Sequence, residues 1–597
     1  MKIFKIFKRY AKKLTWLIIG VVVLAIVLNY VRSLIPLYIG KVFGILDYSE
    51  KSTLPSFIEA LFVGLDTVQQ LLLVMVCIIV TAAIRETVNV ISDLSISYVS
   101  ETIGYNVQTD FYNRVQELPY SYLNSHETGD LIQRSTSDII RVKRFLGEAL
   151  PQMMTGIVQI VIYASQMLII DLRLGGILLA CLPVIVVFST IYHRKMRPTF
   201  SAMEVNEGRL TTVIQENLTG IRVVKAFANE NEEMKKFDES MGTFTGSWRK
   251  LMSRMSSYWA VLDGYSMLLM LFAFVLGVIF IMNNSLNLSQ VISIFLYVQY
   301  IIWPTRMMGR LIGEMSRTNI ASGRILEIVE IPTEFELDNG ELKPEIHGNI
   351  SFENVAFQFS DSNKPTIHNI NLEIKQGETI ALLGKTGSGK SVLVSLLNRM
   401  LETTEGTIKI DGVDIKDIEK KYLRRNVGLV LQEPFLFSMT IAENIGIIQD
   451  KSDLTRIQEV SEIAAVKSDI ERFDRGFDTM VGERGVTLSG GQKQRISIAR
   501  IIVENKPILV FDDSLSAVDT ETDIKIRNAL NNRQTKATTI IITHRVSTAM
   551  DADRIVILED GTISQIGTFD ELIKQEGLLK NIWEIQNYFE DEKGGVN

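Results

Sequence analysis

Cysteine is nearly absent from this chain: there are two among 597 residues, Cys77 and Cys181. Both lie inside apolar runs where a disulfide framework has no use, so we expect them to be packing residues. Long blocks of like charge are also missing, and no basic stripe alternates with aromatic residues. Nucleic acid is therefore not an expected partner. The net charge of −7 says little about other partners, because composition changes sharply along the chain.

Long apolar runs fill the first half, whereas the part after about residue 316 has the interspersed charge of a soluble domain. Each run is close to the ~20 apolar residues that cross a bilayer. The sequence therefore predicts an α-helical six-span membrane domain in contact with the lipid bilayer. The expected spans are 14–40, 67–90, 148–170, 174–195, 258–282 and 288–312.

Basic residues set the expected orientation. Residues 1–13 carry six basic residues and no acidic one, and the long second and fourth connections are also rich in Lys and Arg. Because basic loops stay on the cytoplasmic side, we expect both termini to be cytoplasmic. Each of these two connections has the length for a helical hairpin of about 45 Å, which could act as a lever on the spans.

Polar and aromatic residues of the last two spans leave two interpretations open. Asp263 either contacts a cationic substrate or is neutralised by an ion pair or by the membrane interface. The aromatic and methionine side chains either line a site for a small hydrophobic substrate or pack helices together. These side chains are Tyr265, Met267, Met270, Tyr297, Tyr300 and Trp303.

A phosphate-binding motif of the form G-x-x-x-x-G-K-[ST] stands in the second half, after an expected strand at Thr379–Leu383. Backbone N–H groups of such a loop surround phosphates, Lys390 reaches the β and γ oxygens, and Ser391 holds Mg²⁺. The following helix turns its positive end toward the phosphates. ATP and Mg²⁺ are thus the expected cofactors. The loop comprises Gly384, Lys385, Thr386, Gly387, Ser388, Gly389, Lys390 and Ser391.

A carboxylate for the metal follows the apolar run Ile508–Phe511. This run reads as a buried parallel strand that ends in Asp512. A carboxylate in that place holds Mg²⁺ through water beside the hydroxyl of Ser391.

A second motif lies about a hundred residues after the phosphate loop, and the two together resemble the nucleotide-binding domain of the ABC (ATP-binding cassette) family. The resemblance implies that this signature motif presses on the γ-phosphate held by another nucleotide-binding domain, so that the ATPase works as a pair. Residues 123–138 and 216–230 resemble the coupling segments of ABC exporters with a type 1 transmembrane domain. The signature motif is Leu488, Ser489, Gly490, Gly491 and Gln492.

Four further residues take their expected roles from this resemblance. Phe359 is in the place of an aromatic that stacks on adenine, although alternation with Val355 and Phe357 also fits a half-buried strand. Gln432 resembles the glutamine that contacts Mg²⁺ and transmits nucleotide state. His544 resembles the histidine that contacts the γ-phosphate, and Glu483 lies in a loop that resembles the exporter contact with the coupling segments.

Asp513 departs from the family pattern, which has a catalytic glutamate here. A carboxylate shorter by one methylene is withdrawn by roughly 1 Å from the water it polarises, so hydrolysis at this site should be slow. The alternative is that Asp513 works through a shifted water. The signature motif is intact, and residues 516–519 resemble the dimer-interface loop of the family. We therefore hypothesise a heterodimer with a second ABC half-transporter that bears the glutamate.

The sequence as a whole predicts an ABC exporter half-transporter of a bacterial inner membrane that moves a drug-like hydrophobic or amphipathic substrate by alternating access. A lipid or peptide exporter of the same build, and an ATP-regulated channel or sensory subunit, are the alternatives. The second domain is expected to be an α/β P-loop NTPase with a helical subdomain. The expected division is a basic segment 1–13, a membrane domain 14–316, a linker 317–348, a nucleotide-binding domain 349–590 and a tail 591–597.

Overall fold

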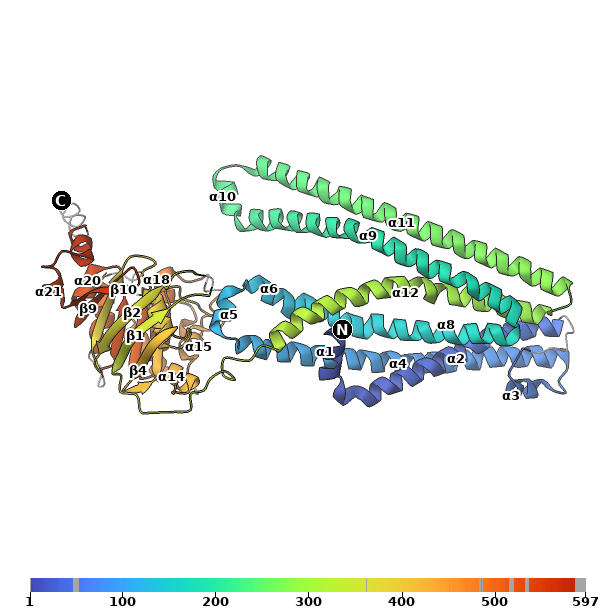
Figure 1. The fold of residues 1–597 in the computed structure, drawn as a ribbon, viewed down its shortest axis with the longest axis horizontal. Coiled ribbons are helices and arrows are strands. Elements are labelled where there is room, and N and C mark those ends of the chain that lie inside the picture. Colours follow the sequence, from blue (N-terminus) through green and yellow to red (C-terminus); the bar gives the residue numbers. More distant parts are fainter. Residues whose placement is uncertain are drawn as a thin grey trace. The chain divides into compact units, whose positions relative to one another are not determined.

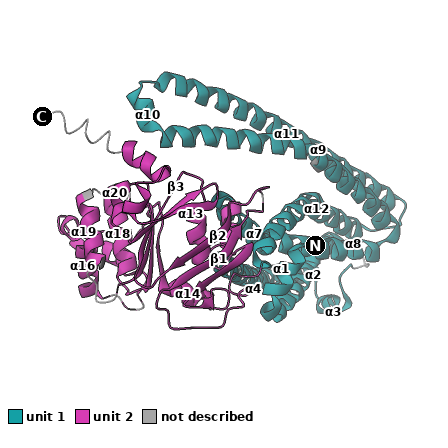
Figure 2. Cartoon of the chain, turned by 60° about the vertical axis from the view of Figure 1, so that its left-hand side comes forward, with its two compact units in different colours: residues 1–116, 127–331 teal, residues 117–126, 332–597 magenta. Residues whose placement is uncertain are grey.

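The computed structural model describes residues 2–46, 53–360, 362–449, 451, 453–482, 485, 487–514, 520–531 and 536–585. The chain forms two compact units, shown in Figure 2. The first unit contains residues 1–116 and 127–331, and the second contains residues 117–126 and 332–597.

The first unit is helical. Within the described residues of this unit, six helices are long and apolar enough to cross a membrane, and each contains one of the six predicted spans. Some of these helices are continuous runs of several labelled elements, such as Thr128–Ile170. The elements are α1 (Lys2–Tyr10), η1 (Lys12–Leu14), α2 (Thr15–Leu46), α3 (Ser56–Glu59), η2 (Ala60–Phe62), α4 (Thr67–Gln116), α6 (Thr128–Gln133), η3 (Arg134–Asp138), α7 (Ile139–Arg144), η4 (Phe145–Ala149), α8 (Leu150–Ile170), α9 (Leu172–Thr219), α10 (Ile221–Ala226), α11 (Glu230–Met282) and α12 (Leu288–Val329).

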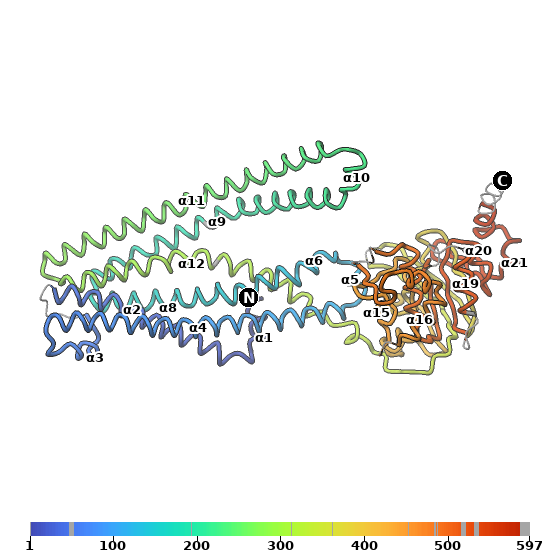
Figure 3. The backbone as a smooth tube through the Cα atoms, turned by 180° about the vertical axis from the view of Figure 1, so that it is seen from behind, coloured from blue at the N-terminus to red at the C-terminus, as the bar shows by residue number. Residues whose placement is uncertain are grey.

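The predicted helical hairpin of the fourth connection is present. Figures 1 and 3 show α9 and α11 side by side, with α10 joining them at the tip. One boundary differs from the expectation, because α12 continues to Val329, through the first part of the segment assigned to a linker. Ala321, Ile325 and Ile328 recur at helical spacing and are buried, which keeps this stretch helical.

Asp263 of α11 forms an ion pair with Arg306 of α12, with 2.7 Å between Oδ1 and the guanidinium. Arg306 is buried, and its guanidinium lies over the ring of Trp259 at 5.0 Å. The ion-pair interpretation of Asp263 is therefore the one that the structure shows. The aromatic and methionine set is divided: Tyr297 is fully buried, whereas Met267 and Trp303 are exposed.

The second unit contains two β-sheets with helices around them. One sheet has the strand order β2-β1-β4-β5, and its strands are antiparallel. The other has the order β10-β9-β3-β8-β7-β6, and it is parallel except for β10. Parallel strands buried on both faces read as continuous apolar runs, as Ile508–Phe511 does.

The strands are β1 (Ile350–Phe357), β2 (Ile367–Ile374), β3 (Thr379–Gly384), β4 (Glu405–Ile410), β5 (Val413–Asp414), β6 (Val427–Val430), β7 (Ile508–Asp512), β8 (Thr538–Ile542), β9 (Arg554–Glu559) and β10 (Thr562–Gly567). The helices are α5 (Tyr120–Ser125), α13 (Lys390–Leu397), α14 (Lys420–Asn426), α15 (Ile441–Gly446), α16 (Leu454–Ile463), α17 (Lys467–Ile470), η5 (Gly476–Asp478), α18 (Gly490–Ile502), α19 (Thr520–Asn531), α20 (Val546–Met550) and α21 (Phe569–Leu572).

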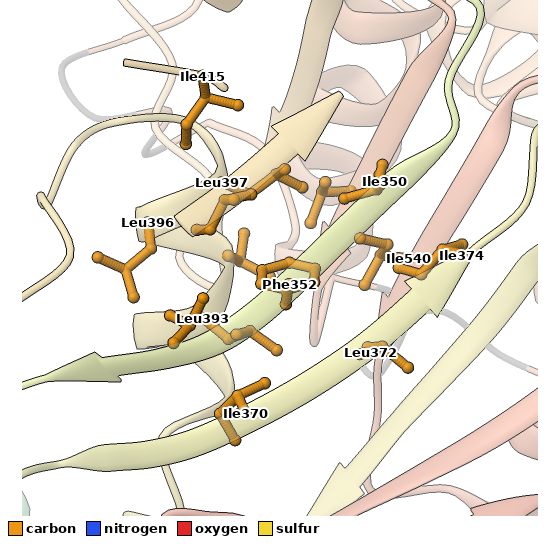
Figure 4. Close-up of a cluster of buried hydrophobic side chains, with 14 of the residues drawn as sticks. Ile350, Phe352, Ile370, Leu372, Ile374, Leu393, Leu396, Leu397, Ile415 and Ile540 are labelled. Atoms are coloured by element: carbon orange, nitrogen blue, oxygen red, sulfur yellow. The ribbon is translucent and has the colours of Figure 1, made fainter. Parts of the chain in front are cut away.

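A shared apolar core holds α13 in place between the sheets. Leu393 and Leu397 of α13 belong to the same buried cluster as Phe352 of β1 and Ile540 of β8, as Figure 4 shows. This packing fixes the helix whose first turn carries Lys390 and Ser391 of the phosphate-binding motif.

Candidate nucleotide site

The phosphate loop runs from the end of β3 to the start of α13, as the sequence predicts. Gly389 at the N-cap of α13 has a φ of 100°, and a Cβ there would lie 2.3 Å from Ile367 Cγ2. Only glycine satisfies both conditions at this close turn. The Lys390 ammonium donates to the carbonyl oxygens of Gly384 (2.8 Å) and Lys385 (2.9 Å), so it lies over the loop.

A pocket of about 230 Å³ opens over this loop. It brings together the ends of β3, β7 and β8 and the residues just after β6, which lie at one edge of the sheet because these strands are parallel. The pocket thus brings together most of the predicted site, including the phosphate loop and Asp512, which are more than a hundred residues apart in the sequence. Its lining residues are Thr366, Thr386, Gly387, Gly389, Lys390, Ser391, Val392, Gln432, Asp512, Asp513, Ile542 and His544.

Ser391 and Asp512 are adjacent, as expected for a shared metal site. The Ser391 hydroxyl donates to Asp512 Oδ1 at 3.2 Å. Burial raises the pKa of Asp512, and the nearby charge of Asp513 adds to this, while Ser391 and Lys390 oppose it. A cation at the carboxylate would offset the cost of that buried charge.

The pKa of Lys390 is also shifted toward the neutral form of the side chain. Burial lowers the pKa of its ammonium, and the charges of Asp512 and Asp513 oppose the effect only in part. A phosphate group would favour the charged form of this lysine. The pocket therefore has the donors for phosphates and the oxygen atoms for a hard cation, so its residues fit a nucleoside triphosphate with Mg²⁺.

Asp513 is held by its backbone. Its N–H donates to the carbonyl of Ile542 in β8 at 3.0 Å, and its φ is 46°. Aspartate tolerates this left-handed region better than most residues. Gln432 and His544 line the same pocket and are both exposed. The three residues expected to position water or metal therefore surround one space.

The signature motif forms the start of α18. Ser489 is its N-cap: the hydroxyl accepts from the Gln492 N–H (3.3 Å), and the Gln492 side chain accepts from the Ser489 N–H (3.0 Å). Leu488 is buried, while Ser489 and Gly490 are exposed. Among the described residues, none of the five lines the pocket over the phosphate loop.

Phe359 does not line the pocket either. It lies just after β1, partly buried, with its ring edge-on to Phe357 at a centroid distance of 4.8 Å. Adenine stacking on Phe359 stays a prediction. Glu483 and the segment 516–519 lie outside the described residues. The start of the loop that contains Glu483 is described: Val481 N–H donates to the Met439 carbonyl at 2.8 Å.

Thr366 lines the pocket although the sequence analysis did not select it. Its N–H donates to the carbonyl of Phe357 at 2.8 Å, and this pairing of β1 with β2 brings Thr366 to the loop. In the sequence, Thr366 is marked only by its position directly before the strand that begins at Ile367. The register between β1 and β2 was needed to identify it as a pocket residue.

The expected coupling segment 123–138 is divided between the units, since 117–126 belongs to the second unit and the rest to the first. Within the second unit, the Glu117 carbonyl accepts from Glu334 N–H at 2.8 Å. Glu334 in turn forms a bidentate ion pair with Arg424 of α14, at 2.7 and 2.9 Å. Residues 117–126, which include the start of this segment, are therefore joined to the rest of the second unit by a backbone hydrogen bond at Glu117, and the residue that donates it is itself held by Arg424.

Comparison with known proteins agrees with this geometry. The family "ABC transporter transmembrane region" matches residues 17–305, and the family "ABC transporter" matches residues 367–516. The chain is 32% identical to "Putative multidrug export ATP-binding/permease protein YgaD" of Bacillus subtilis, over 82% of this chain and 85% of that protein. It is 33% identical to "Uncharacterized ABC transporter ATP-binding protein YknU" of the same organism, over 82% and 84%.

The fold is also similar to a solved structure, "Structure of a bacterial Atm1-family ABC exporter with ATP bound". The TM-score is 0.79 at 22% identity, and the match covers 96% of this chain and 98% of the other. A membrane domain of six spans and one ATP-binding domain with its phosphate loop and signature motif are thus fused in a single polypeptide. The chain belongs to the ABC transporter family, as a membrane-embedded half-transporter of the exporter type that hydrolyses ATP.

Proposed function

We propose that this chain exports a hydrophobic or amphipathic, drug-like substrate by alternating access, as one half of a heterodimer whose phosphate loop on this chain hydrolyses ATP slowly. The relative YgaD is named for multidrug export, which supports the substrate class. Met267 and Trp303, on α11 and α12, are exposed and offer adaptable apolar contacts. The basic residues of 1–13 support an orientation with both termini in the bacterial cytoplasm.

In this proposal Ser391, Asp512 and Gln432 hold Mg²⁺, with Asp512 acting through water. The metal would neutralise charge on the β and γ phosphates. The 3.2 Å contact of Ser391 with Asp512 supports the assignment, because both oxygens already point to one place. Lys390 and the loop N–H groups would bind the phosphates, His544 would contact the γ-phosphate, and Phe359 would stack on adenine.

The observation that carries the slow-site proposal is the fixed backbone of Asp513. Its hydrogen bond to Ile542 and the sheet behind it hold the Cα in place, so a backbone shift does not make up for the missing methylene. A general base must lie within hydrogen-bond reach of the water. A 10²-fold loss of rate corresponds to only about 2.7 kcal/mol of barrier, which a misplacement of roughly 1 Å accounts for.

The signature motif supports a partner with a competent site. Its N-cap is well formed, and Ser489 is exposed at the start of α18, where N–H groups and the helix dipole favour an anion. In the heterodimer this motif would complete the ATP site on the partner's phosphate loop. Closure of the two nucleotide-binding domains would then move the coupling segments, with Glu483 as a contact of this chain.

The test is ATP hydrolysis by the purified chain in liposomes. We expect slow turnover, a rise on the order of 10²-fold for Asp513→Glu, and loss of the remaining rate for Asp513→Asn. Asp560→Glu is a matched control, because Asp560 has a φ of 47° but lies in the β9–β10 turn. Its rate should not change. Fast turnover of the unmodified chain that Asp513→Asn abolishes would refute the proposal.

A second measurement tests the heterodimer. A partner half-transporter with glutamate at the corresponding position should restore fast hydrolysis when both chains are purified together. Ser489→Arg in this chain should then abolish that hydrolysis, although the substitution leaves both phosphate loops unchanged. Retention of the fast rate in Ser489→Arg would show that the motif does not complete the partner's site.

A further inference from the structure

An apolar cavity of about 370 Å³ lies in the first unit, next to the N-terminal helix α1. Side chains from five further segments close it: α2 and α8 at positions within the first and third predicted spans, and α4, η4 and α12 at positions just beyond the predicted spans. No Lys, Arg, Asp or Glu is among the lining residues. Representative lining residues are Phe7 of α1, Val21 of α2, Ile96 of α4, Leu146 of η4, Met154 of α8 and Met315 of α12.

The depth of the cavity follows from α2. The lining residues Ile18, Val21 and Ala25 lie 3 to 10 residues after the helix begins at Thr15, which corresponds to roughly 5 to 15 Å along its axis. An interfacial helix such as α1 lies about 5–10 Å into the boundary between headgroups and acyl chains. The cavity therefore extends from the level of α1 into the acyl-chain region of the same leaflet.

A basic groove adjoins the cavity. Lys2, Lys5 and Lys8 line it together with Phe4 and Asn319, and Phe4 also lines the apolar cavity. The aromatic ring of Phe4 thus stands where the two meet. The lysine ammonium groups of the groove lie beside the apolar volume of the cavity. An anionic lipid requires this arrangement, with cations for its headgroup and an apolar space for its acyl chain.

Acidic groups near the groove do not cancel this charge. The Lys5 ammonium lies 3.6 Å from Glu330, but both side chains are more than half exposed, and such pairs contribute little. A neighbouring part of the surface next to Lys2 and Lys5 also carries Arg324 and Glu327. Among the described residues, no carboxylate forms an ion pair with Lys2 or Lys8.

The helix that carries the lysines is anchored to the unit. The N–H of Lys2 donates to Asn319 Oδ1 of α12 at 2.8 Å, and the Tyr10 hydroxyl donates to Asp110 of α4 at 2.5 Å. Ile3 and Ile6 of α1 are buried. Both ends of α1 are therefore fixed, so the cavity exists before any ligand enters.

We propose that this cavity binds one anionic phospholipid of the surrounding leaflet, with an acyl chain in the apolar volume and the phosphate on Lys2, Lys5 and Lys8. Water is a poor occupant of the volume, because Ser92 and Thr155 supply the only side-chain hydroxyls of the lining and a buried water needs two to four polar partners. A lipid enters from the bilayer without leaving its leaflet. The bound lipid is a structural ligand that holds α1 against α4 and α12, separate from the exported substrate.

The test uses the full chain in phosphatidylcholine liposomes that contain a trace of phosphatidylglycerol with a photoreactive diazirine on one acyl chain. Peptides labelled by light are identified by mass spectrometry. We expect labels on the peptides that contain 3–7 and 150–155, whose lining residues include Phe4, Phe7 and Met154. Val21→Trp and Met154→Trp fill the volume from two different helices and should each remove these labels. Val23→Trp is the matched control, since Val23 is 52% exposed on the same helix and should leave them unchanged.

The headgroup is tested with charge variants of equal size. Each lysine near a membrane surface contributes about 1 kcal/mol to binding of an anionic lipid, so Lys5→Gln with Lys8→Gln should lower labelling on the order of 30-fold relative to the unmodified chain. Lys12→Gln with Lys13→Gln removes the same charge from exposed residues outside the groove and should change it much less. Equal losses in the two double variants would overturn the phosphate site.

Two further outcomes would overturn the whole proposal. One is labelling that persists in both Val21→Trp and Met154→Trp, and the other is labelling spread evenly over all spans. A phosphatidylcholine probe with the same chain should label the cavity more weakly than the phosphatidylglycerol probe. Unchanged far-UV circular dichroism and an unchanged size-exclusion profile of each variant show that the helical first unit is folded, so loss of labelling with both retained is not misfolding.

Discussion

Gly389 combines a φ of 100° with a neighbour, Ile367 Cγ2, that a side chain would meet at 2.3 Å. Replacing it tests how closely the phosphate loop depends on one residue. Gly389→Ala should lower ATP affinity at least about tenfold, because the strain of about 1–3 kcal/mol is relieved only by moving the loop. Binding of a fluorescent ATP analogue measures the change.

Gly412→Ala provides the comparison. Gly412 has a φ of 83°, but no atom lies within 4 Å of its missing Cβ, and it is outside the pocket. We expect a small loss of thermal stability with ATP affinity unchanged. If Gly389→Ala binds ATP as well as Gly412→Ala does, the close approach to Ile367 is not what shapes the loop.

Single residues of the site were predictable where a motif fixes the chemistry. Lys390, Ser391 and Asp512 lie together as the spacing of loop and strand indicated, because parallel strands end at a common edge. Asp513 could be placed but its φ could not, since backbone angles depend on the neighbouring strand. Thr366 was missed because nothing in one sequence gives the register between β1 and β2.

At the scale of elements, an ion-pair network holds the third membrane helix to α12. Arg324 contacts Asp130 and Asp138, with 3.1 Å to the latter, and Arg134 contacts Asp130 and Glu327 at 2.7 and 2.8 Å. Asp138 is 2% exposed and ends the π-helical segment Arg134–Asp138. An extra residue in a helical turn often marks a functional segment.

Removing one partner of an ion pair in this network should lower the stability of the chain. Arg324→Gln leaves the buried carboxylate of Asp138 with less compensation and should destabilise the chain by about 3 kcal/mol. Adding Asp138→Asn should recover part of the loss, since the uncompensated charge is then gone. Thermal unfolding of the two single variants and the double variant gives the coupling.

Lys235→Gln is the matched control for charge, because Lys235 pairs with Glu232 on the exposed surface of α11. Its effect should be below about 0.5 kcal/mol. Strict additivity of Arg324→Gln and Asp138→Asn would show that the 3.1 Å contact does not contribute to stability.

Helices were easier to predict from this sequence than their ends. Each span is a long apolar run, so all six were found, but α4, α9, α11 and α12 continue well past the bilayer-spanning part. The apolar signal ends there, while backbone hydrogen bonds and packing continue the helix. The π-helical segment Arg134–Asp138 could not be predicted, because its charged residues pair with Arg324 and Glu327 of α12, far along the chain.

At the scale of the whole molecule, the α9–α11 hairpin exposes apolar side chains at its tip. Val223 is 61% exposed and Phe227 is 79% exposed, beside the surface ion pair of Lys225 with Glu230. Charged surroundings place this tip outside the hydrocarbon region, and we expect protein to cover its apolar side chains in the working dimer. The tip lies in the predicted coupling segment 216–230.

Phe227→Asp should therefore abolish the stimulation of ATP hydrolysis by substrate while basal hydrolysis of the assembled transporter is retained. The readout is the ATPase rate in liposomes with and without a hydrophobic dye. Met241→Asp changes an exposed residue of the same hairpin away from the tip and should keep the stimulation. Normal stimulation in Phe227→Asp would show that this tip does not transmit the nucleotide state.

The division of the chain into two interleaved units has a consequence for proteolysis. The polypeptide passes from one unit to the other three times, at 116–117, 126–127 and 331–332. After a single cut that follows residue 331, the fragment 332–597 has no covalent link to the rest of the chain. It stays hydrogen-bonded to residues 117–126, whose two ends remain attached to membrane helices. Release of the soluble fragment from a membrane pellet will therefore require a denaturant as well as the cut, and the amount needed measures how firmly residues 117–126 are bound.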